Sequence, residues 1–156
     1  VDHFLPRGVA SFFPTDATFC VGVALIGLDR VRPYYRGEEI ARFIPAVLDW
    51  LMAHRCDGLG LFDYWLDRER KAFPSLQAHL PEALYQGYRL TGDLKYLKAA
   101  WRLFQLHMAG VPLTVQHKYG PPESGLAGGY HISWTMGCLH GFAEQGWLDK
   151  VQLVEV

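Results

Sequence analysis

The chain has 156 residues, enough for one domain with a hydrophobic core, and half of them are apolar, which excludes a disordered chain. Its formal net charge is -1 and its lysines and arginines are scattered, which argues against a nucleic-acid partner. The longest apolar run, residues 17–28, is too short to cross a bilayer, so we expect neither a membrane span nor a signal peptide.

The cysteines do not suggest a covalent or metal-bound framework. Cys20, Cys56 and Cys138 lie far apart, and no two of them form a closely spaced pair. Disulfide scaffolds and zinc fingers depend on such pairs. This usage favours a reducing compartment, with the three thiols buried as small apolar side chains.

Five helices are predicted from apolar periodicity, capping residues and turn signals. They cover residues 16–31, 38–54, 75–90, 93–108 and 131–145. The second and fourth carry an apolar stripe on one face and polar residues on the other, which is typical of an outer layer. The other three are apolar or rich in small residues on most sides, so we expect them to be buried as an inner layer. Alternation in residues 151–156 is only a weak strand signal.

A phrase of the sequence recurs along the chain. Residues 87–97 resemble residues 141–151 at a step of 54, and a fainter copy occupies residues 32–40. A recurrence of this length, written in helical residues, predicts stacked helical hairpins. At the centre of the phrase, Gly92 is expected to end one helix and Asp93 to cap the next.

The connections between the helices alternate in length. Turns within hairpins are short, whereas residues 55–73 and 110–130 form long links. Short and long links fall at opposite ends of an antiparallel helical array, so both long links are expected on one face. Their length and their aromatic, charged composition favour a functional role for that face. The sequence therefore predicts a single all-α domain over residues 1–156, built from about two and a half antiparallel hairpins.

The stretch from Tyr88 to Ala100 resembles a repeat phrase of the α/α-toroid proteins, the six-hairpin glycosidase-like superfamily of carbohydrate-active proteins. The resemblance implies a partial α/α toroid, with a saccharide cleft at the end where the inner helices begin. That end coincides with the face that carries the long links. Because such a ring has about six hairpins, the resemblance also implies a homo-oligomer or the remainder of a larger chain.

Two carboxylates near this face are candidates for glycoside hydrolysis, which uses a protonated and an ionised carboxyl about 5–9.5 Å apart. Asp63 lies in the first long link beside Tyr64 and Trp65, whose rings could hold a sugar, and Glu82 lies near the start of the third helix. His79 precedes Glu82 on the same helix and is a candidate base or sugar ligand. The alternatives are a solvated acidic loop and a buried, hydrogen-bonded histidine.

The second long link and the helix after it carry side chains suited to a polysaccharide lyase or sugar epimerase. A lyase needs a base beside a uronate carboxyl and a group that neutralises this carboxyl. His117, Tyr119, His131 and Trp134 offer bases and sugar contacts. Many lyases of the α/α-toroid type use asparagine as the neutraliser, and this chain has none, so hydrolysis is favoured. His131 could instead serve only to start its helix.

A metal site is not expected. Cys138 and His140 are faintly similar to the Cys-His segment of lanthionine-cyclase-like zinc proteins, but Leu139 separates them. Alternate positions on a helix point about 200° apart, so the two side chains could not readily share one zinc ion. We therefore expect a glycan-degrading protein that needs neither metal nor cofactor. The rival hypothesis is a non-catalytic helical module that binds a partner and oligomerises.

Overall fold

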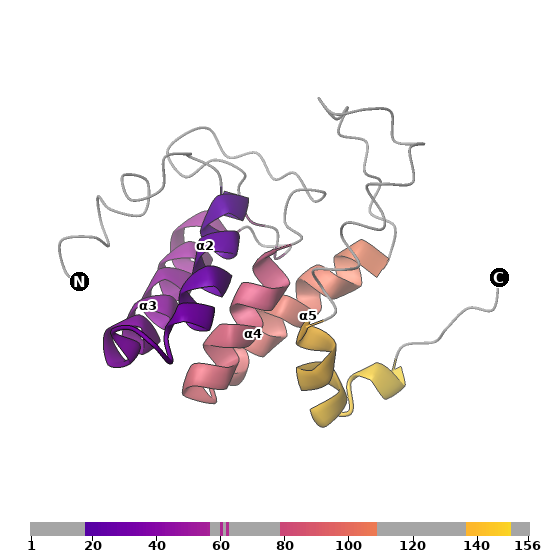
Figure 1. Cartoon of the computed structure of the whole chain (residues 1–156). Helices are drawn as coiled ribbons and strands as arrows, with labels where there is room; N and C mark the ends of the chain where they lie inside the picture. The colour runs from indigo at the N-terminus through magenta and orange to yellow at the C-terminus, as the bar shows by residue number, and fades with distance from the viewer. Residues whose placement is uncertain (1–17, 57–59, 61, 63–78, 109–136, 151–156) are drawn as a thin grey trace, which may run out of the picture.

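The computed structural model describes residues 18–56, 60, 62, 79–108 and 137–150 (Figure 1). Its elements are α2 (Thr18–Val31), α3 (Gly37–Arg55), α4 (Leu80–Thr91), α5 (Leu94–Met108), the helical residues 137–144, here called the last helix, and the 3-10 turn η3 (Leu148–Lys150). Within these ranges the β structure is confined to an isolated antiparallel bridge between Cys56 and Phe62. The all-α prediction is confirmed for this part of the chain. None of the helices described here is long and apolar enough to cross a membrane.

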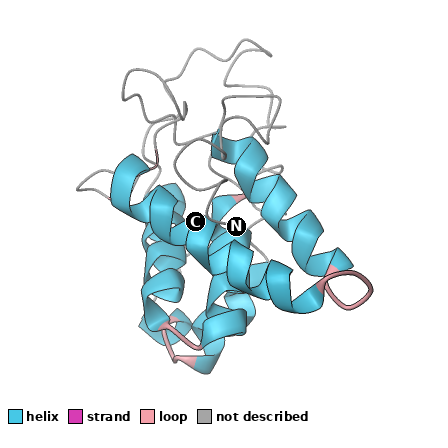
Figure 2. Cartoon of the chain, turned by 90° about the vertical axis from the view of Figure 1, so that its left-hand side faces the viewer, coloured by secondary structure: helices cyan, strands magenta, loops and turns pink. Residues whose placement is uncertain are grey.

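Short turns join the described helices into hairpins (Figure 2). Helices α2 and α3 form the first hairpin and α4 and α5 the second, and α4 contacts α2, α3 and α5. In Figure 1 the turns that follow α2, α4 and the last helix lie at the lower end of the array, and α2 and α4 begin at the upper end. Apart from residues 55, 56, 60 and 62, the links predicted at 55–73 and 110–130 lie outside the described residues, as does 151–156.

Helix α4 is the centre of the core. From Leu80 to Gly87 every residue except Glu82 is buried. Helix α3 buries a single stripe, made of Ile40, Ile44, Val47, Leu48 and Leu51. Burial of one stripe at this spacing is what an amphipathic outer helix shows, whereas a helix buried nearly all round lies inside the fold. The inner and outer characters predicted for these two helices therefore agree with their burial.

Helix α2 is less buried than its apolar sequence suggested. Val21 and Leu25 are fully buried, but Val23 and Val31 keep 41% and 47% of their surface exposed. Among the described elements, α3 and α4 pack against α2. Most of the α2 residues whose burial is described are nevertheless buried or half-buried, as expected, and the exposed ones are Val23, Gly27, Arg30 and Val31.

The turn between α4 and α5 contains a C-cap for the first helix and an N-cap for the second. Gly92 adopts a left-handed backbone (φ 73°), and its N–H donates to the carbonyl of Tyr88 at 2.7 Å. The carboxylate of Asp93 accepts the N–H of Lys95 at 2.9 Å, and the N–H of Asp93 donates to the hydroxyl of Thr91 at 3.1 Å. The predicted roles of Gly92 as helix terminator and Asp93 as cap are confirmed.

The second copy of the phrase also ends a helix, at Gly146. This glycine is left-handed (φ 63°), and its N–H donates to the carbonyl of Ala143 at 2.9 Å. The next N–H, of Trp147, donates to the carbonyl of Phe142 at 2.9 Å, and the two rings stack with centroids 6.1 Å apart. Two such bonds with an apolar contact make a Schellman motif.

The faint first copy differs at its centre. The left-handed residue of the α2–α3 turn is Arg36 (φ 46°), and Gly37 begins α3 instead of ending a helix. A Cβ on Gly37 would lie 2.9 Å from the carbonyl oxygen of Arg32, so glycine is needed there for close approach. The glycines at 37 and 92 occupy corresponding positions in the repeat, but Gly37 allows a close backbone approach, whereas Gly92 provides a left-handed helix end.

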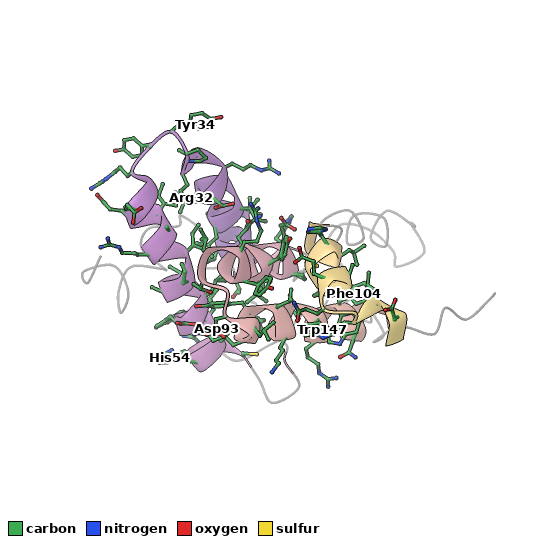
Figure 3. All side chains as sticks on the ribbon, turned by 90° about the horizontal axis from the view of Figure 1, so that it is seen from below. Arg32, Tyr34, His54, Asp93, Phe104 and Trp147 are labelled. Atoms are coloured by element: carbon green, nitrogen blue, oxygen red, sulfur yellow. The ribbon has the colours of Figure 1, made fainter. Side chains whose placement is uncertain are left out.

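An aromatic cluster holds the last helix against α5. The ring of Trp101 packs edge-on against Phe142 with centroids 4.9 Å apart, and its centroid lies 5.3 Å from that of Phe104 and 5.7 Å from that of Trp147. Phe104 and Trp147, both partners of Trp101 in this cluster, are labelled in Figure 3. Such rings bury large areas and prefer offset or edge contacts, so they fix the orientation of the two helices.

Candidate functional site

Two of the predicted catalytic residues, His79 and Glu82, fall within the described part of the chain, at the start of α4. The remaining predicted site residues, Asp63, Tyr64, Trp65, His117, Tyr119, His131 and Trp134, lie outside it. The candidate site is therefore built from α4 and from the helices that pack against its first two turns.

Local sequence explains why α4 starts where it does. Pro81 occupies the first turn, where its missing N–H would have no acceptor in the helix. The N–H of Ala83 donates to the carbonyl of His79 at 3.2 Å, which closes that turn. His79 is 3% exposed, and a Cβ on Gly22 of α2 would lie 3.2 Å from its Cβ. Burial lowers the pKa of His79, so its neutral imidazole is favoured.

Glu82 is a partly buried carboxylic acid in the first turn of α4. Its Oε1 accepts a hydrogen bond from Gln86 Nε2 at 2.9 Å. Its Oε2 is buried, and within the described residues no donor bonds to it. A Cβ on Gly137 would overlap this carboxyl, so the last helix passes directly against it. Burial raises the pKa of Glu82, while the Gln86 hydrogen bond and the charge of Arg89 oppose the rise.

Gln86 and Arg89 were not singled out by the sequence, yet they complete the setting of Glu82. Arg89 Nη1 donates to Gln86 Oε1 at 3.0 Å, and Gln86 is only 7% exposed. The three residues follow i, i+4, i+7 spacing, which places them along one face of a helix. The spacing of these three polar residues could have indicated that they interact. A single glutamine in an otherwise apolar stretch of helix, however, does not by itself suggest a functional role.

Tyr85, which follows Glu82 by three residues on α4, contacts the last helix. A Cβ on Gly141 would lie 2.6 Å from Tyr85 Cε2, so the ring is in close contact with a glycine. Burial raises the pKa of Tyr85. His79, Glu82 and Tyr85 thus each pack against a glycine of a neighbouring helix, namely Gly22, Gly137 and Gly141. These three residues occupy helix–helix contacts at the start of α4.

Cys138 lies beside the same carboxyl. It is fully buried, and burial, with a smaller effect from the charge of Glu82, raises the pKa of its thiol to about 12. A thiol with such a pKa stays protonated near neutral pH and is a poor nucleophile. His140 is mostly exposed, and its Nε2 lies 3.1 Å from Glu144 Oε1. Within the described residues no three histidine, cysteine or carboxylate side chains come together as a metal site.

The chemistry open to this arrangement is proton transfer by Glu82. A carboxyl whose neutral form is favoured by burial can hold a proton at a pH where an exposed glutamate has lost it. Burial raises the pKa of both the Cys138 thiol and the Tyr85 phenol, so ionisation of either group is disfavoured. No protein-family model matches the chain, and no curated protein or solved structure is significantly similar to it. The proposed function therefore rests on the site and on the resemblance of residues 88–100.

Proposed function

We propose that this chain is part of a carbohydrate-active α/α toroid that hydrolyses glycosidic bonds, with Glu82 as the proton donor. The observation that carries the proposal is the setting of Glu82. It is a carboxyl in the first turn of the most buried helix, half removed from water, with its neutral form favoured. A glycosidase needs such a group to protonate the oxygen of the leaving sugar.

The second carboxylate of the proposed reaction is Asp63. Glu82 gives its proton to the glycosidic oxygen as the carbon–oxygen bond breaks, and Asp63 either attacks the sugar carbon or activates a water molecule that does so. Trp65, Tyr64, Tyr119 and Trp134 are proposed as sugar platforms, and His79, His117 and His131 as polar contacts. The two hairpins beside each other, with α4 inside, support the toroid part of the proposal.

The test is hydrolysis of a panel of neutral and acidic polysaccharides, measured as release of reducing ends. Glu82→Gln keeps the size of the side chain and removes the acid, so kcat should fall roughly 10²–10⁴-fold while the far-ultraviolet circular dichroism is kept. Asp63→Asn should lower kcat as well. Glu38→Gln is the matched control, because Glu38 also lies in the first turn of a helix but is 90% exposed. Full activity of Glu82→Gln would refute the proposed role.

The same assay separates hydrolysis from the lyase or epimerase alternative. Elimination creates a carbon–carbon double bond that absorbs in the ultraviolet, whereas hydrolysis does not. Epimerisation releases no reducing ends and changes only the configuration of the sugar. Product absorbance together with chain cleavage would move the chemistry from Glu82 to a base in residues 110–134.

A second candidate function, a non-catalytic binding module, is favoured by the surface of the α2–α3 turn. Tyr34 and Tyr35 are 89% and 61% exposed, and Tyr34 projects from the turn in Figure 3. Tyrosine and arginine are enriched where proteins bind partners, and Arg36 adjoins this pair with its guanidinium 6.0 Å from the Tyr35 ring centroid. If no polysaccharide is cleaved while Tyr34→Ala and Tyr35→Ala abolish binding to a glycan array, this function replaces the first.

The toroid proposal has a consequence for assembly. Two hairpins and one further helix make only part of a ring, so copies of the chain, or the remainder of a larger chain, are proposed to complete it. The native mass of the purified chain tests this. Oligomers support completion by copies, and a stable monomer of 17.7 kDa counts against it.

A further inference from the structure

The chain of contacts from Arg89 through Gln86 to Glu82 has a fixed direction. Arginine carries only N–H donors and stays protonated, so it cannot accept a hydrogen bond. Its Nη1 lies 3.0 Å from a side-chain atom of Gln86, and this atom must therefore be the amide oxygen. The direction follows from chemistry and does not depend on telling the nitrogen of the amide from its oxygen by shape.

The amide nitrogen of Gln86 then points the other way, toward Glu82. At 2.9 Å its N–H donates to Glu82 Oε1, and an oxygen that accepts this bond cannot also present a hydroxyl hydrogen along the same line. Gln86 is 7% exposed, so its amide has little access to water, whereas Arg89 is exposed. One of the two oxygens of Glu82 is thus committed as an acceptor.

We infer that Arg89, acting through Gln86, determines which oxygen of the Glu82 carboxyl carries the proton, and that this oxygen is Oε2. The buried Oε2 is bonded to no donor of the described residues, so a proton on it meets no competing N–H. Arg89 and Gln86 are then positioning residues: they fix the orientation of the carboxyl, whose Oε2 packs against the last helix, and do not exchange protons themselves. The use of this proton in glycoside hydrolysis rests on the proposed function, whereas its position on Oε2 does not.

Other charges act on Glu82 and must be separated from this effect. Arg30 and Asp29 act on it from α2, Arg89 from its own helix, and Cys138 faces it from the last helix. Arg30 supplies a matched control, because it carries the same charge as Arg89 and the structure gives it no hydrogen bond to the described Gln86 side chain.

The experiment is a double-mutant cycle read by carbon-13 NMR of the Glu82 carboxyl, assigned by its loss in Glu82→Gln. Removing the donor in Gln86→Met should raise the pKa of Glu82, because the ionised form loses a hydrogen bond. Arg89→Met should also raise the pKa, since the amide becomes free to turn its oxygen toward the acid. In the Gln86→Met background, Arg89→Met should have a clearly smaller effect, and Arg30→Met should have the same effect in both backgrounds.

Equal effects of Arg89→Met with and without Gln86 would overturn the inference, because Arg89 would then act only as a distant charge. If Gln86→Met does not fold, the side-chain NH₂ resonances of Gln86 give the same answer in the natural background. They should move as Glu82 titrates in the wild type, in Arg30→Met and in Arg89→Lys, where a donor is kept, and should respond much less in Arg89→Met. Failure of the proposed function appears separately, as unchanged turnover in Glu82→Gln.

Discussion

The two ends of helix α4 are built in opposite ways. At its start, the partly buried Glu82 has an oxygen without a donor among the described residues, and burial raises its pKa. At its other end, Thr91, Gly92 and Asp93 satisfy one another and the neighbouring backbone with hydrogen bonds of 2.7–3.1 Å. The first arrangement costs stability and the second supplies it.

The contrast separates the start of the helix, where the proposed functional residue Glu82 lies, from its capped end, which is structural. Buried, incompletely satisfied acids are retained where chemistry needs them, whereas a satisfied cap needs no explanation beyond folding. The recurring phrase of the sequence marks the structural end. Because the repeat marks the short turn of each hairpin, it identifies the opposite end of the array as the one where Glu82 lies.

The largest stability effect is expected at the structural end. Gly92→Ala places a Cβ on a left-handed residue, which should cost about 1–2 kcal/mol of unfolding free energy. The space around this position is open among the described residues, so the cost comes from the backbone and not from a clash. Urea denaturation measures it.

Gly27→Ala is the matched control for Gly92→Ala. Gly27 is exposed, has no neighbouring atom within 4 Å in the described structure, and lies in the regular backbone of α2. Alanine there should stabilise the protein by about 0.5–1 kcal/mol. If both substitutions change stability with the same sign, the left-handed cap is not what makes Gly92 necessary.

The start of α4 should make stability depend on pH in the direction that the raised pKa of Glu82 requires. Folding favours the neutral form of Glu82, so its contribution to stability is present below the ordinary pKa of 4.5 and is lost as the pH rises through the raised folded-state value. Glu82→Gln stays neutral at every pH. Its melting temperature relative to the wild type should therefore increase from pH 4 toward neutrality.

Glu38→Gln is the matched control for the removal of a carboxyl charge from the first turn of a helix, because Glu38 is 90% exposed. A difference between Glu82→Gln and the wild type that stays constant or narrows as the pH rises would show that Glu82 is not destabilised by ionisation in the folded protein.

Asp93 should show the opposite sign. Its hydrogen bond to the backbone of Lys95 lowers its pKa, so its stabilising effect is present above the ordinary value of 3.8 and is lost as the pH falls through the lowered folded-state value. Asp93→Ala should lower the melting temperature at neutral pH, with the deficit shrinking in acid. Asp93→Asn, which can still cap the helix, should show a smaller deficit at neutral pH. A deficit that persists unchanged in acid would contradict the role of the charge.

The smallest effect is expected at the α2–α3 turn, where arginine occupies the left-handed position. Arg36→Gly removes the strain at φ 46° and loses an exposed ion pair with Glu39, which contributes little. The melting temperature should rise by ~1–3 °C. Arg42→Gly, the same change within the regular backbone of α3, should lower it. A fall in both variants would mean that the Arg36 side chain matters more than its backbone.

Much of the local structure could be predicted from the sequence. Apolar spacing predicted α3 with its buried stripe, and the cap at Gly92–Asp93 depends on residues adjacent in the chain. Contacts between residues that are far apart in the sequence could not be predicted from apolar spacing or capping residues. The cluster of Trp101 with Phe142 depends on how the last helix packs on α5, and the exposed face of α2 depends on which helices surround it.

The candidate site divides in the same way. Glu82 is a candidate from the sequence because carboxylates near the start of an inner helix are few, and His79 because it precedes Glu82 on the same helix. The contact of Glu82 with Gly137 could not, since 55 positions separate them along the chain. Gln86 and Arg89 had a spacing signal, but their orientation becomes meaningful only once Gln86 is known to be buried.

The titration of Glu82 in the wild-type protein tests the contrast between the ends of α4 most directly. The carbon-13 shift of its carboxyl is followed with pH, and the Glu38 carboxyl serves as an exposed reference in the same sample. The structure predicts that the pKa of Glu82 lies above the ordinary value of 4.5. A midpoint at or below 4.5 would show that the start of α4 does not hold a protonated acid, and would contradict the account.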